Sequence, residues 1–214
     1  MSGPASGAVA ERLVLHEYPP SGNCYKVRLT AALLGRPLER RRYDTRGGET
    51  RTPAFLARIN PNGRVPVLQI GERYLPESNA AILWLAEGTA LVPADAFDRA
   101  TMLAWLFFEQ NGHEPNIAAL RNWLGYVGEA KLSAAQRGAI ASKRAGGEEA
   151  LGVMEAHLAR RDWFVGDAAT LADVALYAYT HVAGEGGFDL GRYPAIRAWF
   201  GRVEALPGYL PLSA

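Results

Sequence analysis

Pro66-Val-Leu-Gln-Ile70, then Gly71-Glu72, then Arg73-Tyr-Leu75: this stretch has the pattern of a β-hairpin, two short apolar runs separated by a turn pair. Strands joined by so tight a turn run antiparallel. A helix is predicted directly after it over Ser78–Glu87, with Ser78 as the N-cap. The stretch therefore predicts the antiparallel part of a sheet, followed by a helix that packs on it.

Two further strands are predicted before the hairpin, at Arg12–Tyr18 and Leu38–Tyr43. Asn23–Leu34 lies between them and predicts an amphipathic helix with one apolar face, which ends at Gly35. A strand–helix–strand crossover makes its two strands parallel. With a short helix over Pro53–Ile59, the expected element order is β-α-β-α-β-β-α.

Beyond Gly88–Pro93, which has the composition of a linker, the pattern becomes helical. Helices are predicted over Ala94–Gln110, from the capping box at Ser133 to about Arg161, from the capping box at Thr170, and from Pro194 to near Gly208. We therefore expect an α/β domain over residues 12–88 and an all-helical domain over residues 94–214.

The overall composition excludes several classes of protein. The chain has 214 residues, of which 49% are hydrophobic, and its 23 basic and 22 acidic residues nearly cancel. This balance argues against a nucleic-acid partner or a membrane surface, and no apolar run is long enough to span a bilayer. Cys24 is the only cysteine, which excludes an intrachain disulfide and fits a reducing, cytoplasmic location. Met1–Ala10 has the composition of a loose tail rather than a signal peptide.

Four local motifs join this element order. They are Ser21-Gly-Asn-Cys-Tyr-Lys-Val27, Asn60-Pro-Asn-Gly-Arg-Val-Pro66, Glu77-Ser-Asn-Ala-Ala-Ile82 and Thr170-Leu-Ala-Asp173. Each motif is weak alone, but together and in this order they make the chain resemble the cytosolic glutathione transferase superfamily over about residues 12–210. The resemblance implies a thioredoxin-like N-terminal domain that binds glutathione, a homodimer, and detoxification chemistry without a metal.

The activity that the resemblance implies is attack of the glutathione thiolate on a small hydrophobic electrophile held under the helical domain. Two alternatives stay open. One is glutathione-dependent reduction of disulfides or peroxides. The other is a transferase-like binding module without turnover.

Four residues are expected to bind glutathione. The resemblance implies a cis bond at Val65-Pro66, which turns the Val65 backbone outward to pair with the peptide like an added strand. At Glu77-Ser78, a simple N-cap explains the serine equally well. A helix N-terminus also binds anions, so Ser78 is expected to hold the γ-glutamyl carboxylate and Glu77 its ammonium.

Ser21 and Asn23 are the expected catalytic residues. Ser21 stands between a strand and a helix, where a turn or N-cap serine is equally plausible. The resemblance implies that its hydroxyl donates a hydrogen bond to the glutathione sulfur, with Asn23 as a second donor. The Ser-x-Asn spacing is also similar to the Thr-x-Asn of the bacterial Nu class, which tends towards disulfide reduction. Cys24 is expected to be a small buried side chain.

The electrophile pocket is expected around Phe108, Asn111 and His113, with Phe107 in the core. Gly112 and Pro115 are expected to bend or end the helix there. The donors to the glycyl carboxylate are not evident, although Arg51 and Gly63 lie in the region. The dimer interface is expected around Ala80–Glu87 and Ala94–Gln110, with Glu109 or Gln110 reaching the partner's glutathione.

Overall fold

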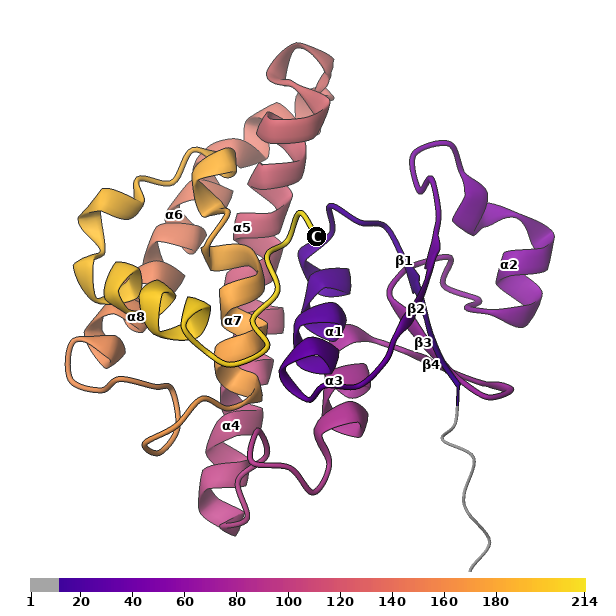
Figure 1. Cartoon of the computed structure of the whole chain (residues 1–214). Helices are drawn as coiled ribbons and strands as arrows, with labels where there is room; N and C mark the ends of the chain where they lie inside the picture. The colour runs from indigo at the N-terminus through magenta and orange to yellow at the C-terminus, as the bar shows by residue number, and fades with distance from the viewer. Residues whose placement is uncertain (1–11) are drawn as a thin grey trace, which may run out of the picture.

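The computed structural model describes residues 12–214, so the predicted tail Met1–Ala10 lies outside the described residues. Figure 1 shows a sheet with three helices beside an all-helical part. No helix of the described chain is both long and apolar enough to cross a membrane. Within residues 12–214, no group of three His, Cys, Asp or Glu side chains is placed to hold a metal ion.

The sheet has the strand order β2-β1-β3-β4. Strands β1 (Leu13–Glu17) and β2 (Glu39–Arg42) are parallel, with Leu15 opposite Arg40. Strand β3 (Val67–Ile70) pairs antiparallel with both β1 and β4 (Arg73–Pro76). The predicted parallel crossover and the antiparallel hairpin are thereby confirmed, as is the mixed α/β class of this part.

Helices cover both faces of the sheet. On one face lie α1 (Gly22–Leu33) and α3 (Ser78–Ala86), which pack on each other, and α2 (Pro53–Arg58) lies on the other face (Figure 1). The prediction that α1 has one apolar face is wrong. Helix α1 is buried from Cys24 to Ala31 because the helical part covers its other side through α7 (Leu171–Thr180).

The first long helix of the C-terminal part does not end at Pro115. Its turns run through α4 (Ala96–Phe108), a π-helical segment over Glu109–His113, α5 (Glu114–Leu120) and a second π-helical segment over Arg121–Val127. Pro115 stands in the first turn of α5, where a missing backbone N–H is tolerated. The π turns insert extra residues into the helix and so change which side chains face the N-terminal part.

Two further α-helices, α6 (Ala134–Leu158) and α8 (Pro194–Glu204), pack on each other in the helical part. Helix α6 opens with the predicted capping box at Ser133, and α8 ends four residues before the expected Gly208. Four short 3-10 helices complete the described chain, at Glu49–Arg51, Glu129–Lys131, Ala183–Gly186 and Leu190–Arg192.

The glycine pair inside α6 is explained by close packing. A Cβ on Gly147 would lie 2.4 Å from Cζ of Phe188, and one on Gly146 would lie 2.8 Å from Nδ2 of Asn116. Glycine costs roughly 1 kcal/mol inside a helix. Here the absent side chains let a neighbouring helix and loop approach, which offsets that cost.

Candidate functional site

Ser21 occupies the turn between β1 and α1. It is the N-cap of α1, and its Oγ accepts a hydrogen bond from the backbone N–H of Cys24 at 3.3 Å. A hydroxyl that accepts still has its own hydrogen to donate. The capping role and a donor role towards a ligand are therefore compatible, because they use different parts of the same group.

Asn23 is held between the two parts of the chain. Its Oδ1 accepts from the Ser78 hydroxyl at 3.2 Å, and its Nδ2 donates to Oε1 of Glu114 at 3.2 Å. Ser78 belongs to α3 and Glu114 to the helical part, so one amide links three elements. Two bonds fix the orientation of this amide beside Ser21.

The Val65-Pro66 bond is cis, as the resemblance implied. The start of α3 differs from expectation by one residue: Glu77 is the N-cap position, without a side-chain cap bond, and Ser78 is the first helical residue. Glu77 has φ 69°, the one positive φ of a non-glycine residue in the described chain. A positive φ costs a non-glycine residue about 1–3 kcal/mol, so the backbone at Glu77 is strained and the surrounding structure holds it in this conformation.

One cavity of about 330 Å³ brings the predicted residues together. Ser21, Asn23, Val65, Pro66, Glu77 and Ser78 all line it. Arg51 and Gly63 line it too, and Arg51 donates to the backbone oxygen of Asn62 at 3.0 Å. A Cβ on Gly63 would lie 2.6 Å from Arg51 Nη1, so glycine is needed there for the arginine to lie as it does.

A second cavity of about 640 Å³ adjoins the first, and Tyr18, Ser21, Thr45, Arg64 and Glu114 line both. Tyr179 of α7 also lines it, with its ring packed on the turn: a Cβ on Gly22 would lie 2.7 Å from that ring. Burial raises the pKa of the Tyr179 hydroxyl, although hydrogen bonding with Ser21 and with the Asn23 backbone opposes this. Ser21 thus lies between two adjoining cavities.

Comparisons with known proteins agree with this geometry. The family model of the glutathione S-transferase N-terminal domain matches residues 20–87, and that of the C-terminal domain matches residues 120–207. Glutathione S-transferase 3 from Zea mays is 32% identical over 206 residues, which cover 92% of this chain and 91% of that protein.

The chain belongs to the glutathione S-transferase family. A crystal structure of glutathione S-transferase from Pseudomonas fluorescens superposes with a TM-score of 0.89 at 44% identity, covering 94% of this chain and 99% of that one. The disulfide-bond oxidoreductase YfcG of Escherichia coli is 29% identical over 76% of each chain. The expected superfamily and two-part fold are thereby confirmed.

A buried ion pair lies beside the first cavity, in contact with Ser78. Lys26 Nζ donates to Glu109 Oε2 at 2.8 Å, and both side chains have no exposed surface. The same ammonium donates to Asn79 Oδ1 at 3.2 Å and to Ser78 Oγ at 3.4 Å. The expectation that Glu109 reaches a partner subunit is therefore wrong, because its carboxylate is enclosed within this chain.

Glu114 and Gln110 are lining residues that the sequence did not reveal. Both belong to the helical part, and both line the first cavity. Burial, followed by the nearby Glu109 carboxylate, raises the pKa of Glu114 above its ordinary value, while Lys26 and the Asn23 amide oppose the shift. The signal in the sequence was the four-residue spacing of Gln110, Glu114 and Ala118, which places these residues on one helix face.

The structure corrects the expected electrophile pocket, since none of its three residues lines either cavity. His113 is fully buried with Nε2 at 2.8 Å from Thr180 Oγ1, and burial lowers its pKa to about 4. Phe108 packs edge-on against Trp105, and Asn111 is exposed. Phe107, expected in the core, is 66% exposed. Asn111 and His113 lie within the π segment Glu109–His113, whose wider turn changes the direction of their side chains from that in an α-helix.

Cys24 lies beside the site without facing it. Its side chain is fully buried, and its Sγ accepts from the Tyr18 N–H at 3.4 Å. Burial raises the pKa of the thiol to about 12. A thiol that stays protonated at neutral pH is a poor nucleophile, which agrees with the expected structural role.

Proposed function

We propose that this chain is a glutathione transferase whose first cavity binds glutathione and whose second cavity binds a small electrophile. The observation that carries the proposal is the place of Ser21, which lines both cavities at their junction. A glutathione sulfur beside Ser21 would be able to reach an acceptor molecule bound in the second cavity. Glutathione is a co-substrate in this scheme, and no metal takes part.

Glutathione fits the polar groups of the first cavity. In the proposed pose, the N-terminal turn of α3 with Ser78 holds the γ-glutamyl carboxylate, and the Glu77 carboxylate holds the ammonium. The Val65 backbone pairs with the cysteinyl residue. Arg51 lines this cavity and not the second, so its guanidinium is our choice for the glycyl carboxylate.

The Ser21 hydroxyl is proposed to stabilise the thiolate. A free thiol has a pKa near 8.5, and lowering it to about 6.5 requires roughly 2.7 kcal/mol of preference for the thiolate. One hydrogen bond to a charged group supplies about 1.5–3 kcal/mol, and the dipole of α1 adds up to ~1 kcal/mol. Ser21 and this helix therefore suffice for the activation, and the Asn23 amide is the second donor.

A panel assay tests the proposal. We expect glutathione-dependent turnover of an activated aryl chloride such as 1-chloro-2,4-dinitrobenzene, with a rate above that of the uncatalysed reaction. The panel also contains a hydroperoxide and a mixed disulfide. If none of the three substrates is turned over, the proposed enzymatic activity is contradicted, and the transferase-like binding module is the alternative that stands.

Disulfide reduction is the second candidate. The fixed Asn23 amide beside Ser21 favours it, together with the similarity to a protein named as a disulfide-bond oxidoreductase. In the same panel, faster turnover of the mixed disulfide than of the aryl chloride would place reduction ahead of conjugation.

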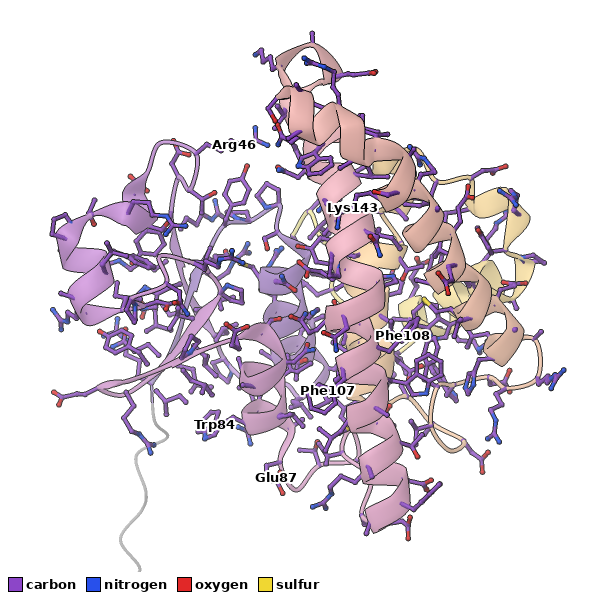
Figure 2. All side chains as sticks on the ribbon, turned by 180° about the vertical axis from the view of Figure 1, so that it is seen from behind. Arg46, Trp84, Glu87, Phe107, Phe108 and Lys143 are labelled. Atoms are coloured by element: carbon purple, nitrogen blue, oxygen red, sulfur yellow. The ribbon has the colours of Figure 1, made fainter. Side chains whose placement is uncertain are left out.

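We also propose a cytoplasmic homodimer with domain boundaries at residues 12–88 and 94–214. The face that carries α3 and α4 supports the dimer, since Phe107 is 66% exposed there and Trp84 is half-buried (Figure 2). An exposed aromatic side chain close to a half-buried one is typical of a surface that a partner covers.

A further inference from the structure

The wall of the second cavity is unusual for a site that takes apolar molecules. Its lining in the described chain contains no Leu, Ile, Val, Met, Phe or Trp side chain, and its aliphatic part comes from small residues such as Ala118, Ala119 and Pro115. Pockets for apolar ligands are lined mainly by large hydrophobic side chains. Three tyrosines, at 18, 126 and 179, supply flat surfaces that end in hydroxyl groups.

Two arginines line this cavity without forming an ion pair in the described chain. Arg46 and Arg64 are exposed, and neither forms an ion pair with a carboxylate within residues 12–214. The Arg46 guanidinium lies over the ring of Tyr126, 5.2 Å from its centroid, and so reaches from the N-terminal part across to the helical part (Figure 2). It lines only the second cavity, whereas Arg64 lines both.

A third arginine stiffens the wall. Arg121 is buried, and its Nε donates to Glu185 Oε2 at 2.8 Å, while Nη1 donates to the backbone oxygen of Pro20 at 2.7 Å. It also donates to the Tyr126 hydroxyl, so the ring under Arg46 is fixed. Because Glu185 neutralises its charge, Arg121 adds no net positive potential to the cavity. Its role is to hold the Tyr126 ring in place.

The one acidic group that the described residues place in the lining of the second cavity lies where the two cavities meet. Glu114 lines both cavities and accepts from the Asn23 amide, which places it at the junction beside Ser21. Arg64 also lines both cavities, and its positive charge opposes the rise in the pKa of Glu114. Arg46 lines the second cavity alone, so the basic end of this cavity, away from the sulfur, is at Arg46. Such a polarised cleft concentrates anions at its basic end.

We propose that the acceptor molecule is an electrophile that carries a carboxylate, held by Arg46 and Arg64, with its reactive carbon turned towards Ser21. This inference rests on the proposed transferase function. In the reaction of an aryl chloride, the glutathione sulfur forms a bond to the ring carbon, and chloride leaves with the electron pair of the carbon–chlorine bond. The thiol proton is released to solvent.

A matched pair of substrates tests this inference. We would measure kcat/KM at saturating glutathione for 4-chloro-3,5-dinitrobenzoate and for its carboxamide, each divided by its uncatalysed rate constant with glutathione. The expected preference for the carboxylate is about tenfold, which corresponds to about 1.4 kcal/mol. It should decrease as salt rises, because the screening length shrinks from about 10 Å at 0.1 M to about 3 Å at 1 M.

The arginine variants then locate the interaction. Arg46→Met and Arg64→Met should each lower the preference to about threefold or less, since a hydrogen-bonded charge is lost. Arg46→Lys should retain part of it. Arg58→Met is the matched control, because Arg58 lies on α2 and lines neither cavity of the site.

Each outcome decides one statement. Equal normalised rates for the two substrates would overturn the carboxylate inference and leave the transferase function standing. A tenfold preference that survives both arginine variants would overturn the assignment to Arg46 and Arg64. If neither substrate is turned over, while glutathione still binds in calorimetry, the proposed function fails and the inference fails with it.

Discussion

The Lys26 ammonium lies 2.8 Å from the Glu109 carboxylate, and both side chains are completely enclosed. Lys26 comes from α1 of the N-terminal part and Glu109 from the helical part, so the pair crosses the contact between the two. Asn79 and Gln110 each donate a hydrogen bond to Oε2 of Glu109, at 3.2 Å and 2.8 Å. The pair therefore lies within a polar network directly under Ser78.

Removal of one partner of this pair should destabilise the fold strongly. For Lys26→Met we expect a loss of about 3–5 kcal/mol in the free energy of unfolding, because Glu109 is left buried and unpaired. Lys26→Met combined with Glu109→Leu should lose clearly less than the sum of the two single changes. Urea unfolding measures all three variants. Additive losses would show that the two charges do not depend on each other.

Ser21→Ala should raise the pKa of bound glutathione by roughly one to two units, equivalent to ~1.4–2.7 kcal/mol. Less thiolate is then present at neutral pH, and the loss of rate should shrink as pH rises past the shifted pKa. The pH profile of kcat/KM and the thiolate absorbance of the bound peptide measure this. Asn23→Ala tests the second donor in the same way.

Cys24→Ala is the control for this experiment, because the Cys24 thiol is buried with its pKa raised to about 12. It should cost some stability without a change in rate. Loss of activity in Cys24→Ala, together with an unchanged pH profile in Ser21→Ala, would replace thiolate stabilisation with a cysteine-based redox mechanism.

Glutathione should bind saturably, with an affinity between micromolar and low millimolar. Calorimetry should show weaker binding to Glu77→Gln and to Ser78→Ala, each by roughly tenfold, since each removes one bond to a charged group. Arg58→Met should bind like the unchanged protein. If calorimetry shows no heat at about 10 mM glutathione, the binding free energy is weaker than about −2.7 kcal/mol. The proposed glutathione site would then be wrong.

The chain should form a two-fold dimer through α3 and α4. Light scattering should give about twice the chain mass of 23.2 kDa, and Phe107→Glu should shift the equilibrium to the monomer, because it puts a charge into an apolar contact. Phe97→Glu, at the other strongly exposed aromatic position of α4, maps how far the interface extends. A mass near 23.2 kDa at micromolar concentration would refute the dimer.

His113 should make the fold sensitive to acid. Burial lowers its pKa to about 4, so the unfolded chain takes up this proton first as pH falls below the ordinary value near 6.5. As pH falls from the higher of these two pKa values to the lower, His113 reduces the free energy of unfolding by a total of roughly 3 kcal/mol. Asp173 acts in the opposite direction, because burial raises its pKa to about 6 and the folded state binds that proton first.

The comparison between the chain and His113→Gln isolates the histidine, since Asp173 is common to both. The free energy of unfolding, measured by denaturant from pH 7 to pH 4, should fall more steeply in the unchanged chain. Parallel curves would mean that the pKa of His113 is the same in the folded and unfolded states.

The sequence by itself determined the order of elements in the N-terminal part, its tight turn and the starts of several helices. The hairpin at Ile70–Arg73 and the capping boxes at Ser133 and Thr170 depend on residues that are neighbours along the chain. For the same reason, the motifs at Ser21, Pro66 and Glu77 predicted residues that do line one cavity. Each stands at the end of a strand or the start of a helix, and the order of the strands brings these ends together.

Tertiary structure alone decided which helix faces meet. Lys26 is enclosed because it pairs with Glu109, which is more than eighty residues away in the chain. The spacing of charges along α1 does not predict this partner. His113 is buried and Glu114 lines the cleft because a π turn shifts the register of the helix between Phe108 and Pro115. Side-chain direction on a helix depends on its turn geometry and on what packs against it, and both are properties of the folded chain.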